Sequence, residues 1–331
     1  CIRDRFASVS KLTRFAILTA VAVQVVIPRA LSAQQSDREE RIAELSERYE
    51  KSEHRVAMRD GTTLYMAVYA PRDRTEELPI LLKRTPYSCR PYGAEQISSM
   101  IGPSRTLEDD TFIFVCQDVR GRYMSEGEFD NMRPHVPGEV PIDESSDTWD
   151  TVEWLVNNVP GNNGKVGMWG ISYPGFYAAA ALPEAHPALV ASSPQAPISD
   201  FYFDDFHHHG AYTLAYWFIT PVFGYQQDSL NTGNWFSFPA RSSRDGYKFY
   251  MDLGPLKNSD SYYGEDNFFW TDLVEHPNYD EFWQERSILP HLTGVDHAVL
   301  TVGGWYDAED LFGPLNIYRK LERENPGIAY N

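Results

Sequence analysis

The segment "GISYPG", residues 170–175, has the residue types and spacing of a nucleophilic serine suited to acyl transfer. Ser172 follows the apolar run "KVGMW" and precedes the Ala-rich run "PGFYAAAAL". A strand that passes directly into a helix forces the serine into a sharp turn, which only small neighbours such as Gly170 and Gly175 permit. The N–H of Tyr173, at the start of the helix, is the natural donor to an oxyanion. The alternative is a Gly-rich turn whose serine only caps the helix.

Asp307 is the candidate acid partner of this serine. In hydrolases with this turn, the acid follows a later strand. Asp307 comes directly after the apolar run "HAVLTVGGW", so we expect it at the carboxyl end of a strand, on the same edge of the sheet as Ser172. There it would orient the histidine that activates the serine. The alternative is a surface aspartate that caps the following helix.

The histidine base is the missing member of this arrangement. The sequence has nine histidines and the last is His297, so none follows Asp307. The chain order serine, acid, histidine then places the base beyond residue 331, and this part of the chain alone is expected to be inactive. The run "HHH" at residues 207–209 is the other candidate, as a base or as metal ligands. Because consecutive side chains point in different directions, packing is favoured, and no metal or other cofactor is expected.

Strands and helices alternate around these residues. Strand patterns lie at residues 62–71, 79–87, 111–121, 165–170, 188–195 and 297–305. Helical spacing of apolar residues lies at 143–158, 174–182 and 311–324. Alternation of this kind predicts an α/β fold, with a mostly parallel sheet covered by helices on both faces.

Residues 200–290 differ from the rest of the chain. They contain more than half of its 20 Tyr, 18 Phe and 8 Trp, and they have no run long enough for a core strand. Rings with polar tips suit the roof of a ligand pocket. We therefore predict an inserted cap between two core parts, residues 54–199 and 291–331. The alternative is an ordinary second core region.

The first residues resemble a targeting segment. Residues 1–33 combine basic residues, the uncharged run "FAILTAVAVQVVI" and the small residues "ALSA", which is typical of a secretory signal peptide. The apolar run is too short to span a bilayer. We expect a secreted or periplasmic protein with an N-terminal arm at residues 34–53. The alternative is an uncleaved amphipathic anchor.

The net charge and the cysteine content limit the binding partners, disulfides and metal sites that the sequence supports. The formal net charge of −18 argues against nucleic acid and anionic membranes as partners. Beyond the predicted signal peptide only Cys89 and Cys116 remain, and two separate thiols are favoured over one bridge. The absence of CxxC and HExxH spacings in the sequence gives a zinc site no support. The sequence is also compatible with a homo-oligomer.

Six ordered blocks carry a family resemblance from about residue 54 to the end. They read "RDGTTLYMAVYAP", "LLKRTPY", "QDVRGRYMSEGEF", "KVGMWGISYPGF", "HPNYDEFW" and "VGGWYDAEDLFGP". The sequence resembles the serine hydrolases grouped with Xaa-Pro dipeptidyl-peptidases, cocaine esterase, glutaryl cephalosporin acylase and the α-amino acid ester hydrolases. The resemblance implies an α/β-hydrolase fold with a mainly helical cap, followed by a C-terminal β-sandwich domain.

The resemblance also assigns catalytic roles. The nucleophile matches Ser172 and the triad acid matches Asp307, whereas the triad histidine belongs to a block after the last helix here. The hydroxyl of Tyr87 joins the N–H of Tyr173 in the oxyanion hole. The implied reaction is hydrolysis of small-molecule esters or amides through an acyl-enzyme.

The acids after residue 305 indicate the subclass. In the α-amino acid ester hydrolases, residues matching Glu309 and Asp310 join an Asp of the cap to hold the α-ammonium of the substrate, and the cap here offers Asp204 and Asp205. Crowded carboxylates raise each other's pKa unless a cation lies between them. Solvated helix-start acids are the alternative. The other functions left open are a dipeptidyl-peptidase, a glutaryl acylase, a simple carboxylesterase and a non-catalytic binding protein.

Overall fold

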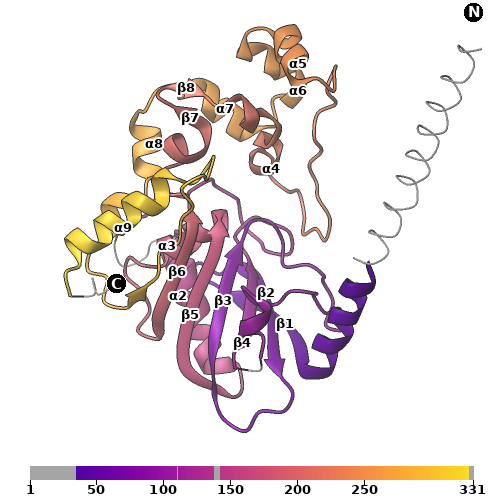
Figure 1. The fold of residues 1–331 in the computed structure, drawn as a ribbon, viewed down its shortest axis with the longest axis vertical. Helices are drawn as coiled ribbons and strands as arrows, with labels where there is room; N and C mark the ends of the chain where they lie inside the picture. The colour runs from indigo at the N-terminus through magenta and orange to yellow at the C-terminus, as the bar shows by residue number, and fades with distance from the viewer. Residues whose placement is uncertain (1–34, 110, 138–141, 328–331) are drawn as a thin grey trace, which may run out of the picture.

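The computed structural model describes residues 35–109, 111–137 and 142–327. These residues contain a seven-stranded sheet with the order β1-β2-β4-β3-β5-β6-β9 (Figure 1). Its strands are β1 (Tyr49–Ala57), β2 (Thr63–Pro71), β3 (Leu78–Thr85), β4 (Ile113–Asp118), β5 (Asn162–Ser172), β6 (Leu189–Pro197) and β9 (Ala298–Val299). The strand β2 pairs antiparallel with β1 and β4, and all other pairs are parallel. The mostly parallel sheet was predicted and is confirmed.

Helices and strands share one large apolar core on one face of this sheet. The helices α2 (Glu144–Asn158) and α3 (Tyr173–Ala180) pack against β5, and α3 also packs against β3 and β6. Apolar side chains of β3 and β5 that point to these helices, such as Ile80 and Val166, are fully buried. The third core helix, α9 (Phe312–Glu324), packs against β6.

The N-terminal residues add an edge strand that the sequence analysis did not assign. Residues 35–48 are helical, and β1 continues directly from them, pairing with β2 from Tyr49 opposite Pro71. The polar sequence of β1 concealed the strand, because an edge strand can carry polar side chains. Lys51, for example, donates to the carbonyls of Pro91 and Gly93. The predicted signal peptide, residues 1–33, lies outside the described residues, and no described helix is long and apolar enough to cross a bilayer.

The prediction that Cys89 and Cys116 stay separate thiols was wrong. The two residues form a disulfide with a Cα–Cα distance of 5.7 Å. The N–H of Cys89 donates to Oδ1 of Asp118 at 2.7 Å, which folds the segment after β3 back over β4. The tertiary fold thus brings the two cysteines within bridging distance.

The predicted cap forms a separate layer. It begins after the carboxyl end of β6, and Figure 1 shows its helices grouped beyond one end of the sheet. They are α4 (Thr220–Gly224), α5 (Gly246–Leu253), α6 (Asp260–Tyr263), α7 (Phe268–Glu275) and α8 (Glu281–Arg286), with the hairpin β7 (His207–His208) and β8 (Ala211–Tyr212). Its interior is aromatic, with the ring of Trp217 packed on those of Phe249 and Tyr263. The mainly helical cap is therefore confirmed.

The strand expected at residues 297–305 is shorter than predicted. Only Ala298 and Val299 form β9, and a single bridge joins Gln195 to Val302 further along. The partner strand β6 contains Pro194, which has no N–H to donate to a continuous ladder. The chain nevertheless follows β6 to its carboxyl end.

The helix α2 begins at a cap that also acts as an electrostatic anchor. Asp143, the N-cap residue, accepts from the N–H groups of Ser146 at 2.8 Å and Val136 at 3.0 Å. It also pairs with Nδ1 of His135 at 2.8 Å. Burial works against the charged form, but these donors lower the pKa of Asp143 to about 2. The charged carboxylate therefore stabilises the folded state.

We expect Asp143→Asn to reduce the free energy of unfolding by about 2 kcal/mol at pH 7. Because the folded pKa lies below the ordinary value of 3.8, this contribution is present above that value and is lost as the pH falls toward 2. Urea unfolding between pH 2 and pH 7 measures it. Asp245→Asn, at the exposed N-cap of α5, is the control and should change little. A difference independent of pH would contradict the assignment.

Candidate active site

Ser172 occupies a strained turn between β5 and α3. Its φ is 64° and its ψ is −128°, a combination that L residues rarely adopt. Its side chain makes no cap hydrogen bond to the described helix. The alternative that Ser172 only caps α3 is therefore wrong, and its hydroxyl is available at the carboxyl edge of the sheet.

The two glycines of the motif are required by close approach of the backbone. A Cβ on Gly170 would lie 2.1 Å from the carbonyl oxygen of Pro174, and one on Gly175 would lie 2.6 Å from that of Gln195. Real Cβ atoms essentially never come this close, so any other residue would displace α3 from β5 or β6. The predicted steric reason for the glycines is confirmed.

Two groups of the predicted oxyanion hole flank the serine. Tyr173 is the first residue of α3, where backbone N–H groups have no intrahelical acceptor. Its buried ring is fixed, because its hydroxyl accepts from the N–H of Met132 and bonds Asn131. The side chain of Tyr87 interacts with that of Ser172, which works to lower the pKa of the Tyr87 hydroxyl. Although 39% of the surface of Tyr87 is exposed, burial of its hydroxyl end raises its pKa.

Asp307 lies beyond the carboxyl end of β9, on the same edge of the parallel strands as Ser172. Its Oδ1 accepts from the N–H groups of Glu309 at 3.0 Å and Asp310 at 3.2 Å. The carboxylate thus holds the turn before α9 and does not cap that helix, which begins five residues later at Phe312.

A buried pair of carboxylates lies beside the serine. Asp310 is 2% exposed, and its carboxyl interacts with the side chain of Ser172. Burial, together with repulsion from Asp204, raises the pKa of Asp310 to about 8. Burial and repulsion from Asp310 raise the pKa of Asp205 well above its ordinary value. Within the described residues, Oδ2 of Asp205 and Oδ1 of Asp310 have no hydrogen-bond partner.

Asp204 differs from its neighbour Asp205. Its Oδ2 accepts from the N–H groups of Ser199 at 2.8 Å and Asp200 at 3.2 Å, and its Oδ1 accepts from that of Gly313 at 2.6 Å. Burial raises its pKa to about 7 against these donors. Asp204 therefore fastens the start of the cap to α9, and Asp205 is the cap residue with free acceptor capacity.

In the part of the chain that the structure describes, no cationic side chain balances the carboxyl groups of this site. Glu309 lies at the surface, and partial burial of its carboxyl raises its pKa. Among the described residues, no Lys, Arg or His forms a salt bridge with Asp205, Glu309 or Asp310. Because buried carboxylates are costly when unpaired, a bound cation would be favourable at this position.

In the run of three histidines, His207 contributes packing. The ring of His207 stacks on that of Tyr202 at a centroid distance of 4.1 Å, and burial lowers its pKa to about 4. His208 and His209 are exposed. Among the described residues, no group of three His, Cys, Asp or Glu could hold a metal ion. The base of Ser172 stays a prediction.

Comparison with known proteins identifies the family. Residues 60–330 match the X-Pro dipeptidyl-peptidase family, S15. The chain belongs to the S15 family. It is 30% identical over 267 residues to the cocaine esterase of Rhodococcus sp. (strain MB1 Bresler), a match that covers 76% of this chain and 43% of the esterase. This confirms the predicted group of serine hydrolases.

Solved structures of S15-like proteins agree with the fold. An α-amino acid ester hydrolase superposes with a TM-score of 0.73 at 32% identity, and an aminopeptidase from a marine sediment archaeon, Thaumarchaeota archaeon, with 0.74 at 33%. Each match covers 84% of this chain and 46% of the other. The α/β-hydrolase fold is thus confirmed, and the chain spans less than half the length of these relatives.

We expect Gly170→Ala to lower the free energy of unfolding by roughly 3 kcal/mol or more, because the added methyl group overlaps the Pro174 carbonyl. Thermal unfolding measures the loss. Gly246→Ala at the start of α5 is the matched control: its Cβ would meet no atom within 4 Å, and the change should stay within about 1 kcal/mol. Equal effects in the two variants would disprove the close-approach argument.

Proposed function

We propose that this S15 protein is a serine hydrolase that cleaves esters or amides of small α-amino acyl groups. The observation that carries the proposal is the buried pair Asp205 and Asp310 beside Ser172, with unpartnered oxygens and raised pKa values. The α-ammonium of a substrate would supply the positive charge that this pair lacks. Glu309 would face the same ammonium from the surface.

The reaction would proceed through an acyl-enzyme. The hydroxyl of Ser172 attacks the substrate carbonyl and passes its proton to a histidine base, which Asp307 would orient. The resulting oxyanion accepts hydrogen bonds from the Tyr87 hydroxyl and the Tyr173 N–H. Collapse of this intermediate expels the alcohol or amine, which takes the proton from the histidine. Water then attacks the acyl-enzyme and releases the acid.

The carboxyl of Asp310, which is proposed to bind the substrate ammonium, lies close to the nucleophile Ser172. This short separation favours substrates with an α-amino group. The side chains of Asp310 and Tyr87 both interact with that of Ser172, so a cation held by Asp310 would lie close to the reacting carbonyl. In an α-amino acyl group, a single carbon separates the ammonium from that carbonyl. A glutaryl substrate carries a carboxylate instead, which the acid pair would repel. This charge argument disfavours the glutaryl acylase reading.

A peptidase acting on free N-termini is the second candidate. The likeness to the archaeal aminopeptidase favours it, because the N-terminal residue of a peptide presents the same α-ammonium beside its carbonyl. The same short separation favours release of one residue, since in a dipeptide the ammonium lies one residue further from the scissile bond. In that case the same site would hydrolyse both esters and amides of a single amino acid, and the two substrates would differ mainly in their rate of hydrolysis.

We also propose that the protein is exported from the cytoplasm. The disulfide between Cys89 and Cys116 supports an oxidising compartment, which agrees with a signal peptide at residues 1–33 and a secreted or periplasmic location. The partner would be a small-molecule ester or amide. The net charge of −18 argues against nucleic acid.

The test compares two esters in protein expressed from its complete reading frame. One is an α-amino acid ester and the other is the same ester without the amino group. Asp310→Asn combined with Glu309→Gln should raise the KM for the amino ester about 10-fold or more, because a desolvated charge pair is lost, and change the other ester less than about 2-fold. An unchanged KM for the amino ester would disprove the ammonium clamp.

Labelling with a fluorophosphonate tests the catalytic class separately. The unmodified protein should form an adduct at Ser172, and Ser172→Ala should form none. Mass spectrometry of the labelled peptide locates the adduct. A protein that binds α-amino esters but forms no adduct would be a non-catalytic binding protein.

The raised pKa of Asp310 predicts a pH-dependent stability. Between its ordinary value of 3.8 and its folded value of about 8, the folded protein holds this proton more tightly, so stability falls as the pH rises. Asp310→Asn removes that cost. We expect it to stabilise the free protein by about 1 kcal/mol or more at pH 8 and to have little effect at pH 4. Thermal unfolding at both pH values measures this, and destabilisation at pH 8 would contradict it.

A further inference from the structure

Arg122 is a buried cation that the mechanism so far does not use. It follows β4 in the segment "DVRGR" and is 0% exposed. Its Nε donates to the carbonyl of Pro86 at 3.1 Å, and its Nη2 donates to that of Val222 at 2.8 Å. Within the described residues its Nη1 has no partner, and no carboxylate forms a salt bridge with it. Its charge interacts with the buried carboxyl of Asp118, but a buried cation without a salt bridge is still costly, so its position needs a reason.

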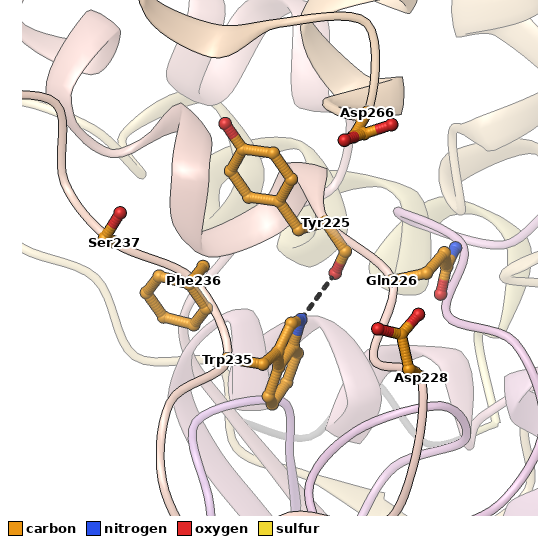
Figure 2. A pocket seen from close by; sticks show the side chains of 7 residues that line it. All are labelled: Tyr225, Gln226, Asp228, Trp235, Phe236, Ser237 and Asp266. Carbon is orange, nitrogen blue, oxygen red and sulfur yellow. Dashed lines mark hydrogen bonds between the residues drawn. The ribbon is translucent and has the colours of Figure 1, made fainter.

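Aromatic rings hold the guanidinium in place. Its central carbon lies 4.6 Å from the ring centre of Phe129 and 4.5 Å from that of Trp235. Figure 2 shows Trp235 in a cap pocket, with its indole N–H donating to the carbonyl of Tyr225 at 2.9 Å. Ring faces attract a cation, and the two carbonyl oxygens replace part of its water. Arg122 is therefore fixed from both the core and the cap.

The two carbonyls that Arg122 binds belong to residues that precede Tyr87 and its ring neighbour Phe223. Pro86 directly precedes Tyr87 in the chain. Val222 lies in α4 and directly precedes Phe223, whose ring packs against that of Tyr87 at 6.3 Å. One side chain thus binds the backbone just before Tyr87 and the backbone just before Phe223, whose ring Tyr87 contacts.

We propose that Arg122 is a positioning residue for the oxyanion hole, which holds the Tyr87 hydroxyl over Ser172 by binding the carbonyls of Pro86 and Val222. This inference rests on the proposed function. Arginine suits the role because its planar fork can donate in two directions at once, whereas lysine is a flexible point charge.

Arg120, two residues earlier, is a matched contrast. It is also buried, but it pairs with Asp60 at 2.6 Å and with Asp147 at 2.6 Å. Its partners lie away from the Tyr87 segment in sequence, before β2 and within α2. The same substitution at Arg120 and Arg122 therefore separates a general structural effect from an effect on the oxyanion hole.

The test is a double-mutant cycle between Arg122→Lys and Tyr87→Phe, with kcat and KM measured on an α-amino ester in the complete protein. Arg122→Lys alone should lower kcat about 10-fold or more with KM changed less than about 2-fold, as expected for a weakened oxyanion donor. In the Tyr87→Phe background, the same change should cost less than about 2-fold, because the hydroxyl it positions is already absent.

Arg120→Lys is the control, and its effect should be the same with or without the Tyr87 hydroxyl. Equal losses from Arg122→Lys in the two backgrounds would overturn the proposal, since a structural role alone gives additive effects. Should Arg122→Lys not fold, Trp235→Leu removes one ring that holds Arg122. It should show the same coupling to Tyr87 at smaller size, and additivity there would equally overturn the proposal.

Crystal structures of the variants make the inference independent of turnover. In the Arg122→Lys or Trp235→Leu protein, the Tyr87 hydroxyl should move away from Ser172, whereas Arg120→Lys should leave it in place. If the unmodified protein hydrolyses no ester, the proposed function fails, and the position of Tyr87 alone decides the inference. An unmoved Tyr87 would overturn it.

Discussion

The steric constraint at Ser172 organises the carboxyl edge of the sheet. Its positive φ costs on the order of 1–3 kcal/mol, which the packing of α3 on β3, β5 and β6 must offset. Gly170 and Gly175 allow the backbones to approach closely enough for this packing. As a result the hydroxyl projects from the sheet at the N-terminus of a helix, and the other groups of the site are arranged around that fixed point.

The second feature of the site is a pair of buried carboxyl groups without a cationic partner among the described residues. Asp204 is buried but satisfied by three backbone N–H groups, whereas Asp205 and Asp310 keep acceptor oxygens without partners in the described residues. Such a pair weakens the free protein and would favour the cation that we propose binds there, because stability and function are often in conflict at such positions. The turn held by Asp307 places Asp310 in this position.

The site lies between the core and the cap, so contacts between these two parts set its geometry. Asp204 joins the start of the cap to α9 through the N–H of Gly313. Arg122 joins the segment after β3 to α4 through two carbonyls. Tyr87 belongs to the core but packs against Phe223 of the cap. Movement of the cap would therefore alter the proposed oxyanion hole as well as the acid pair.

The sequence alone determined the features that depend on local patterns. The alternation of strands and helices predicted the parallel sheet, and "GISYPG" predicted the strained turn, because both follow from periodicity and from the sterics of neighbouring residues. Asp307 could be placed at the edge of Ser172 since parallel strands end on the same side.

Only the tertiary structure decided the contacts between distant segments. It bridged Cys89 to Cys116, separated Asp204 from Asp205 by their backbone partners, and placed Arg122 behind Tyr87. No local pattern carries this information, because each contact depends on how the chain folds back over residues that are far away in sequence. The polar edge strand β1 was missed for a related reason, since its pairing partner and not its own pattern defines it.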